Sequence, residues 1–325
     1  MDYQFNMPIM EYLAQHRSVS QTQIFLAFSN LGEIQGYILV SLFIYVIFDK
    51  RLAVRLAILV ALTMSLNHVL KILIGNPRPF IQQGNYLQKW AVPIENAREL
   101  ATEYSTPSGH AMAASSFYSF LYALVRNRYV RVLAVLTIVL TGISRPYLGV
   151  HFVEDILLGW TVGLGVGLLA AIYADRISEA WHRRGYAQRI VIAVAGSLAL
   201  WLATVAINGW RVDGQPRAFV GYAGTFTGII AAYPLELRFV NFDPRSSSVA
   251  AKITRFLISV ALAIFTLRAL GMAFHSITDD FSILGYLLQY LRYCAVGFVG
   301  IFAAPWVFTK FGLAKRIVST DLAKR

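Results

Sequence analysis

The chain has 325 residues, of which 57% are hydrophobic and only 14% charged, and its mean hydropathy is +0.56. Soluble domains usually carry roughly a quarter charged residues, so this composition excludes a soluble protein. The net charge of +12 does not indicate a nucleic-acid partner, because the charges lie in short turns between apolar segments. A single cysteine, Cys294, excludes an intrachain disulfide and a cysteine-based metal cluster.

Long apolar runs predict an all-α, polytopic membrane helix bundle. The segment 1–26 is polar and mixed, lacks the basic start and apolar core of a signal peptide, and is expected to lie at the membrane interface. A bilayer is crossed by about 20 mostly apolar residues. We expect nine such spans, at residues 27–48, 53–74, 109–125, 130–144, 153–174, 190–208, 218–234, 254–274 and 284–309.

The positive charges predict the orientation of these spans. Of the 29 Lys and Arg residues, 19 lie in the turns 49–55, 126–131, 175–189, 235–255 and 310–325. Because Lys and Arg favour the cytoplasmic side, these turns are expected inside, with the N-terminus outside and the C-terminus inside. The segments 71–108 and 144–152 then both fall on the outer face.

Three polar clusters lie at those outer ends and together indicate an anion site. Lys71, Arg78 and Arg145 are three cations without an equal number of carboxylates, and guanidinium groups match phosphate oxygens in geometry. Ser108 and Gly109 open a span, where free backbone N–H groups and the positive end of the helix dipole bind anions. We therefore expect a phosphate-binding site.

Two histidines supply candidate chemistry at the same site. His151 and Asp155 are four residues apart and share one helix face, so the carboxylate can fix the ring tautomer and leave the other nitrogen free to attack. His110 comes from a different helix and can donate a proton. A nucleophile and an acid on opposite sides of phosphorus suit in-line displacement.

These residues resemble the type 2 phosphatidic acid phosphatase superfamily. Its three-part signature, K-x6-RP, PSGH and SR-x5-H-x3-D, is matched in order and spacing by Lys71 to Pro79, Pro107 to His110 and Ser144 to Asp155, within about residues 55–175. The resemblance implies an enzyme that needs no metal or other cofactor and works through a phosphohistidine. It implies that His151 attacks phosphorus, Asp155 orients it and His110 protonates the leaving oxygen. The phosphoryl oxygens would be held by Lys71, Arg78, Ser108, Gly109 and Arg145.

The resemblance leaves the substrate open. The nine-span layout resembles glucose-6-phosphatase, whereas "SRPYLGVHFVEDILLGW" resembles sphingosine-phosphate and polyprenyl-phosphate phosphatases. We expect hydrolysis of a lipid phosphate monoester or pyrophosphate, of isoprenoid, glycerolipid or sphingoid type, at the outer face of a bacterial inner membrane. The partners would be the phosphorylated lipid and the bilayer, with a homo-oligomer left open. The alternatives are hydrolysis of a soluble sugar phosphate and transport of a phosphate compound.

The segment 27–175 is therefore expected to form a catalytic core of five spans, and 176–325 a four-span extension without a recognisable motif. Two arginines, Arg268 and Arg292, lie within spans of this extension. Charged residues are costly inside a membrane. They are expected to snorkel or to bond to neighbouring spans, with a cavity or a dimer contact as the alternative.

Overall fold

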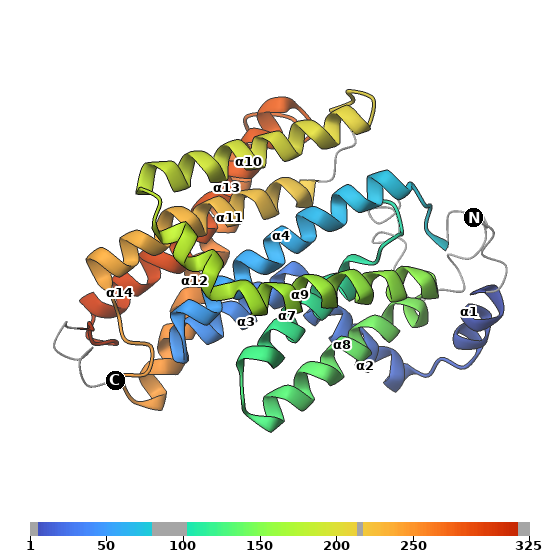
Figure 1. Ribbon diagram of the computed structural model, residues 1–325, viewed down its shortest axis with the longest axis horizontal. Helices are drawn as coiled ribbons and strands as arrows, with labels where there is room; N and C mark the ends of the chain where they lie inside the picture. The colour runs from blue at the N-terminus through green and yellow to red at the C-terminus, as the bar shows by residue number, and fades with distance from the viewer. Residues whose placement is uncertain (1–5, 80–102, 213–216, 318–325) are drawn as a thin grey trace. The chain divides into compact units, whose positions relative to one another are not determined.

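A computed structural model of the chain describes residues 6–79, 103–212 and 217–317, and its regular structure is helical (Figure 1). In the described ranges no β-strand forms, although an isolated bridge pairs Phe242 with Arg316. In chain order the helices are α1 (Asn6–Gln15), α2 (Val19–Leu31), α3 (Ile34–Ile47), α4 (Lys50–Ile74), α7 (Gly109–Leu124), α8 (Arg128–Leu148), α9 (Val153–His182), α10 (Tyr186–Ile207), α11 (Arg217–Leu235), α12 (Val249–His275), α13 (Ile283–Phe298) and α14 (Ala304–Lys310), with π-helical turns η2 (Glu236–Val240) and η3 (Val299–Ala303).

The long helices confirm a polytopic membrane bundle. Within the described ranges, seven helices are long and apolar enough to cross a bilayer: α4, α8, α9, α10, α11 with η2, α12, and α13 continued through η3 and α14. Large apolar side chains on them are exposed, among them Ile172, Leu198 and Phe265, as expected where lipid rather than water surrounds a helix. The chain is an integral membrane protein.

The predicted count of nine spans is not confirmed, for two physical reasons. The predicted span 27–48 is two helices, α2 and α3, which meet at an angle of 63° around Gly32 and Glu33; counted as one broken span, the pair raises the number in the described residues to eight. The predicted span 109–125 is helix α7, whose 16 residues extend only about 24 Å at 1.5 Å per residue, less than the hydrocarbon thickness of about 30 Å.

The described helices form two compact units. Unit 1 comprises Met1–Tyr37 and Thr63–Asp175, and unit 2 comprises Ile38–Leu62 and Arg176–Arg325. Helices α3, α4 and α9 contribute residues to both units.

In unit 1, α8 packs against both α2 and α7. Tyr147 of α8 contacts both α2 and the residues before it. Its hydroxyl bonds Thr22 Oγ1 on α2 at 3.1 Å, and its carbonyl accepts from Arg17 Nε, ahead of α2, at 2.9 Å. Both Arg17 and Thr22 belong to the segment that was expected to be interfacial, and they dock it onto α8.

Close backbone packing joins α9 to α7 in the same unit. Gly159, Gly163 and Gly167 follow one another at four-residue spacing, so they form a stripe on one face of α9. A Cβ atom at Gly163 would lie 2.0 Å from Ser115 Oγ and 2.3 Å from the Met112 carbonyl oxygen. The absence of side chains along this stripe lets the two helices approach closely, and this places the start of α7 beside the start of α9.

The corner between α8 and α9 is closed by a glycine. Gly149 follows the end of α8 with φ 82°, a left-handed conformation that favours glycine. Its N–H donates to the Pro146 carbonyl at 3.1 Å, and the Val150 N–H donates to the Arg145 carbonyl at 3.1 Å. These two bonds form a Schellman motif, which turns the chain from Arg145 toward His151.

In unit 2, α13 packs against both α11 and α12, and α10 packs on α11. Phe219, Val220 and Tyr286 form a buried apolar cluster between α11 and α13. At a different place in the unit, the buried Lys50 ammonium pairs with Glu236 at 3.0 Å.

Candidate active site

The three polar clusters predicted from the sequence meet at one end of unit 1. Lys71 lies in the last turn of α4 and Arg78 follows it; Ser108 and Gly109 begin α7; Arg145 lies in the last turn of α8. His151 precedes α9, and Asp155 lies in the first turn of α9. Four helix ends thus contribute to one site, as the charge distribution predicted.

His151 contacts Asp155 through one ring nitrogen. Nδ1 lies 3.3 Å from Asp155 Oδ2, and the two side chains are almost completely buried, with exposed fractions of 2% and 0%. The carboxylate also accepts from the Phe152 N–H at 2.8 Å, from Ser105 Oγ at 2.5 Å and from Thr106 Oγ1. Asp155 is therefore held in one orientation by three donors besides the histidine.

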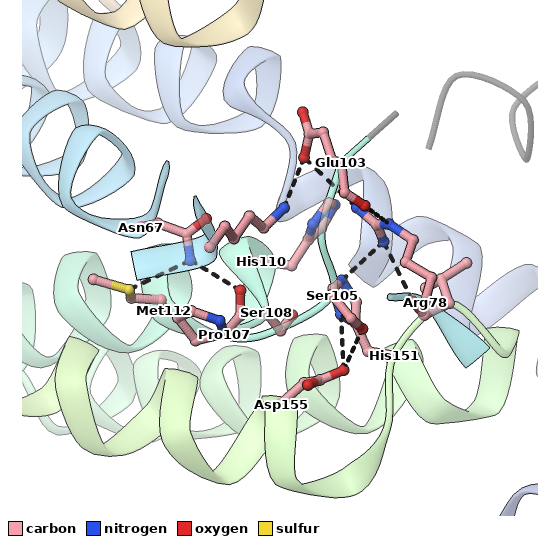
Figure 2. A network of polar contacts seen from close by, with 12 residues as sticks. Asn67, Arg78, Glu103, Ser105, Pro107, Ser108, His110, Met112, His151 and Asp155 are labelled. Atoms are coloured by element: carbon pink, nitrogen blue, oxygen red, sulfur yellow. Dashed lines mark hydrogen bonds and ion pairs between the residues drawn. The ribbon is translucent and has the colours of Figure 1, made fainter. Parts of the chain in front are cut away.

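The other ring nitrogen faces a cation. His151 Nε2 lies 3.2 Å from Arg78 NH1, which also donates to the Val150 carbonyl at 3.2 Å. Figure 2 shows this network running from Glu103 through Arg78 and His151 to Asp155. Burial, followed by the nearby charge of Arg78, lowers the pKa of His151 well below its ordinary value. The ring is consequently neutral at physiological pH, with Nδ1–H toward the carboxylate as the tautomer that fits these partners.

A carboxylate lies between two of the predicted cations. Glu103 Oε2 is 2.7 Å from Lys71 Nζ and 3.6 Å from Arg78 NH2, and the Glu103 carbonyl accepts from Arg78 Nε at 3.1 Å. The charge of Lys71, followed by that of Arg78, lowers the pKa of Glu103 to about 2. Burial lowers the pKa of Arg78, but its guanidinium remains charged. The centre therefore already contains an anion.

The third cation, Arg145, makes a short hydrogen bond through one nitrogen and leaves another nitrogen without an acceptor. NH1 donates to Ser29 Oγ on α2 at 2.5 Å. Nε has no hydrogen-bond partner among the residues that the structure describes, although the side chain is buried. A buried guanidinium N–H without an acceptor is costly, and an anionic ligand would satisfy it.

His110 has its own carboxylate. Its Nε2 lies 3.0 Å from Oε1 of Glu33, which sits in the break between α2 and α3. Glu33 and Glu103, two carboxylates from segments outside the three motifs, thus reach the site and partly balance its cations.

The start of α7 is fixed by backbone contacts. The Ser108 N–H donates to the Asp155 carbonyl at 3.0 Å, and Ser108 Oγ caps the helix by accepting from the Ala111 N–H at 3.5 Å. Asn67 Nδ2 on α4 donates to the Pro107 carbonyl at 3.0 Å, and a Cβ on Gly109 would lie 3.1 Å from Asn67 Oδ1. The N-terminus of α7 therefore belongs to the same centre as His151 and Asp155.

The site includes residues that the motifs did not predict. Ser105 and Thr106 immediately precede the PSGH motif and hold Asp155, whereas Asn67 positions the chain ahead of α7. Glu33 and Glu103 pair with His110 and Lys71. In the described part of the chain, no group of three or more His, Cys, Asp and Glu side chains is arranged to hold a metal ion.

Fold and site together define an integral membrane protein with a buried cationic centre beside a histidine–aspartate pair. Residues 52–179, which contain all three motifs, match the PAP2 superfamily, and residues 220–316 match the transmembrane extension of PAP2 superfamily phosphatases. The chain belongs to the PAP2 superfamily. The extension, for which the sequence showed no motif, is thereby also assigned.

Three relatives illustrate the similarity. Phosphatidylglycerophosphatase B of Bacillus subtilis is 39% identical over 87 residues, covering 24% of this chain and 43% of the relative. Undecaprenyl-diphosphatase of Sulfolobus acidocaldarius is 29% identical over 121 residues, covering 37% and 54%. Sphingosine-1-phosphate phosphatase 1 of Mus musculus is 25% identical over 319 residues, covering 88% and 71%. The similarity thus spans about half the length of the first two relatives.

Proposed function

We propose that the protein is a phosphatase that hydrolyses a phosphate monoester or pyrophosphate of a membrane lipid through a phosphohistidine intermediate. The observation that carries this proposal is a buried, neutral His151 with Asp155 on one ring nitrogen and Arg78 on the other. A neutral imidazole is a nucleophile, the carboxylate stabilises positive charge that develops on the ring, and the guanidinium binds the group that is attacked.

In the first step the Nε2 lone pair of His151 forms a bond to phosphorus while the bond from phosphorus to the leaving oxygen breaks. Nδ1 keeps its proton, so the phosphorylated ring is positively charged and Asp155 stabilises it. The three donors to Asp155 keep this carboxylate in place during the reaction. Arg78, which contacts Nε2 in the resting site, would transfer its hydrogen bond to a phosphoryl oxygen.

The phosphoryl oxygens would take the position of the Glu103 carboxylate. Lys71 and Arg78 already bind an anion there, and Arg145 has an unsatisfied N–H for a further oxygen. The N–H groups at the start of α7, around Ser108 and Gly109, add a favourable dipole. These fixed charges would offset the charge on the equatorial oxygens in the transition state.

His110 would give its proton to the leaving oxygen. Burial and the charge of Arg145 lower the pKa of His110, and its contact with Glu33 supports this role because the carboxylate opposes both effects and stabilises the protonated ring. In the second step a water molecule attacks phosphorus, His110 takes the proton of the water, and the phosphorus–nitrogen bond breaks. Inorganic phosphate leaves, and both histidines return to their starting states.

The names of the three relatives support a lipid substrate, since they describe phosphatases of a glycerophospholipid, a polyprenyl diphosphate and a sphingoid phosphate. The excess of Lys and Arg in the turns at the opposite helix ends supports a site at the outer face, with the C-terminus inside. A bacterial inner membrane is the membrane that we propose.

The test is phosphate release by the detergent-purified full chain from phosphatidylglycerophosphate, undecaprenyl diphosphate, sphingosine 1-phosphate and glucose 6-phosphate. We expect turnover of at least one lipid. His151→Ala should lower kcat at least about 1,000-fold and His110→Ala by about 100- to 10,000-fold. His182→Ala, an exposed histidine near the other end of α9, is the matched control and should retain activity.

The same assay separates the alternatives. Hydrolysis of glucose 6-phosphate alone would replace the lipid assignment by a sugar-phosphate phosphatase. Uptake of a phosphate compound into vesicles without any hydrolysis would indicate a transporter. A 32P label from the substrate, trapped as an acid-labile adduct in wild type and absent in His151→Ala, is expected for a phosphohistidine. Loss of activity in EDTA that added metal restores would contradict a metal-independent reaction.

A further inference from the structure

A second cationic cavity lies in unit 2. It has a volume of about 290 Å³ and is formed where α11 begins, α12 ends and α13 begins. Three arginines, one from each helix, line it: Arg217, Arg268 and Arg292.

The three arginines lie at different depths along their helices. Arg217 is the first residue of α11, Arg268 lies seven residues before the end of α12, and Arg292 lies nine residues after the start of α13. At 1.5 Å per residue the latter two are about 10 and 13 Å from the helix ends. Ionisable residues at this depth are costly, and in membrane proteins they mark binding sites or pathways.

Neighbouring groups fix two of the arginines in place. Arg217 NH1 pairs with the Asp280 carboxylate and NH2 donates to Gln289 Oε1 at 3.1 Å, whereas Arg217 Nε is buried without a hydrogen-bond partner among the described residues. Arg292 Nε donates to the Leu267 carbonyl at 2.8 Å.

The small size of Gly271 leaves space for the Arg292 guanidinium. A Cβ on Gly271 would lie 2.6 Å from Arg292 NH2, so the absence of a side chain at Gly271 lets the guanidinium lie against α12.

The charge of the lining is unbalanced, and its surroundings are apolar. Three guanidinium groups face one carboxylate in the set of residues that lines the cavity. On the same helices, Phe265, Met272 and Ile283 have exposed fractions of 70%, 72% and 68%. A ligand that fits both features carries a negative charge with oxygens for the arginines and hydrocarbon for the exposed surfaces of α12 and α13.

We propose that this cavity binds the phosphate-bearing headgroup of an anionic membrane lipid. The headgroup enters between the ends of α11, α12 and α13, and the acyl chains lie along α12 and α13. Basic pockets between membrane helices bind lipid headgroups through this chemistry. The proposal does not depend on the phosphatase activity, because the cavity belongs to unit 2 and the candidate active site to unit 1.

The test uses the full-length protein, delipidated in detergent and titrated with phosphatidylglycerol while bound lipid is counted by native mass spectrometry. We expect Arg268→Gln/Arg292→Gln to weaken binding at least about tenfold, since two charged donors are lost. Arg268→Gln alone, at an exposed side chain, should preserve the fold and weaken binding in the same direction. The matched control is Arg183→Gln, an exposed arginine of the same unit.

Four results would overturn the proposal. Unchanged affinity in both cavity variants would exclude the arginines, as would an equal loss in Arg183→Gln. Loss of binding only in Arg78→Gln would assign the lipid to the candidate active site instead. Phosphatidylcholine that binds wild type as tightly as phosphatidylglycerol would contradict an anionic headgroup.

A further arm distinguishes the source of the phosphate. Inorganic phosphate should bind at least about tenfold more weakly than phosphatidylglycerol, because it lacks the apolar contacts. Equal binding of inorganic phosphate would mean that the cavity takes a soluble anion, and the lipid assignment would be wrong.

Discussion

Replacing Glu103 by Gln should strengthen the binding of phosphate at the candidate active site. The pKa of Glu103 falls from the ordinary 4.5 to about 2, so the carboxylate gains about 3 kcal/mol from the cations. Because the side chain is 30% exposed, solvent screening reduces the usable part to about 1–2 kcal/mol. A phosphoryl group has to displace this carboxylate, whereas the neutral amide of Gln competes less. Affinity should therefore rise roughly tenfold.

The assay is a titration of the purified full chain with orthovanadate or inorganic phosphate, followed by the ligand-dependent rise in Tm and by inhibition of turnover. Without ligand, the Tm of Glu103→Gln should lie below that of wild type, because Lys71 and Arg78 lose their carboxylate partner. With saturating ligand, the difference in Tm between the two proteins should become smaller. Glu179→Gln, an exposed glutamate on α9, is the control. Unchanged or weaker ligand affinity in Glu103→Gln would refute the competition between carboxylate and phosphate.

Three further changes test the geometry of unit 1. Ser105→Ala removes one donor to Asp155, and we expect kcat to fall about 10- to 100-fold, with Tm lowered by only a few degrees; a normal kcat would exclude a positioning role. The pH profile of kcat/KM should keep its acidic limb well below pH 6.5, because His151, with its lowered pKa, protonates and loses its lone pair only there; a limb at 6.5 or above would contradict a buried neutral nucleophile. Gly163→Val forces a branched side chain against the Met112 carbonyl and should destabilise the protein by at least about 1–3 kcal/mol, measured as a fall in Tm; an unchanged Tm would mean that α7 and α9 separate without cost.

The residues of the three motifs could be predicted from the sequence because each lies at a helix end. The distribution of Lys and Arg predicts that those ends share one side of the membrane, and in the structure Lys71, Arg78, Arg145 and His151 lie near one another. The fold class followed from the apolar runs alone. The sequence also indicates that α9 packs closely against another helix, because Gly159, Gly163 and Gly167 stand at four-residue spacing, a pattern typical of tightly packed membrane helices.

The remaining site residues had no such signal. Glu33 reaches His110 because α2 and α3 are bent at Gly32, and an apolar run with two polar interruptions does not reveal a bend. Glu103 is one of three glutamates in the sequence 80–106, and only the tertiary fold selects it for Lys71. Ser105 and Thr106 stand beside a motif, but hydroxyl groups before a helix are usual in any turn.

The glycine corner between α8 and α9 sets the tolerance of this chain to changes in length. The hydrogen bonds from the Gly149 and Val150 N–H groups back to α8 fix the turn that leads from Arg145 to His151. Arg78 also donates a hydrogen bond to the Val150 carbonyl in this turn. An inserted residue here would shift His151 relative to Arg78 and Arg145. At the other end of α8, the turn around Asn127 is exposed and holds no site residue, so insertions there cost little. Active relatives of this sequence should therefore differ in length at the turn before α8 and keep a constant length at the turn after α8.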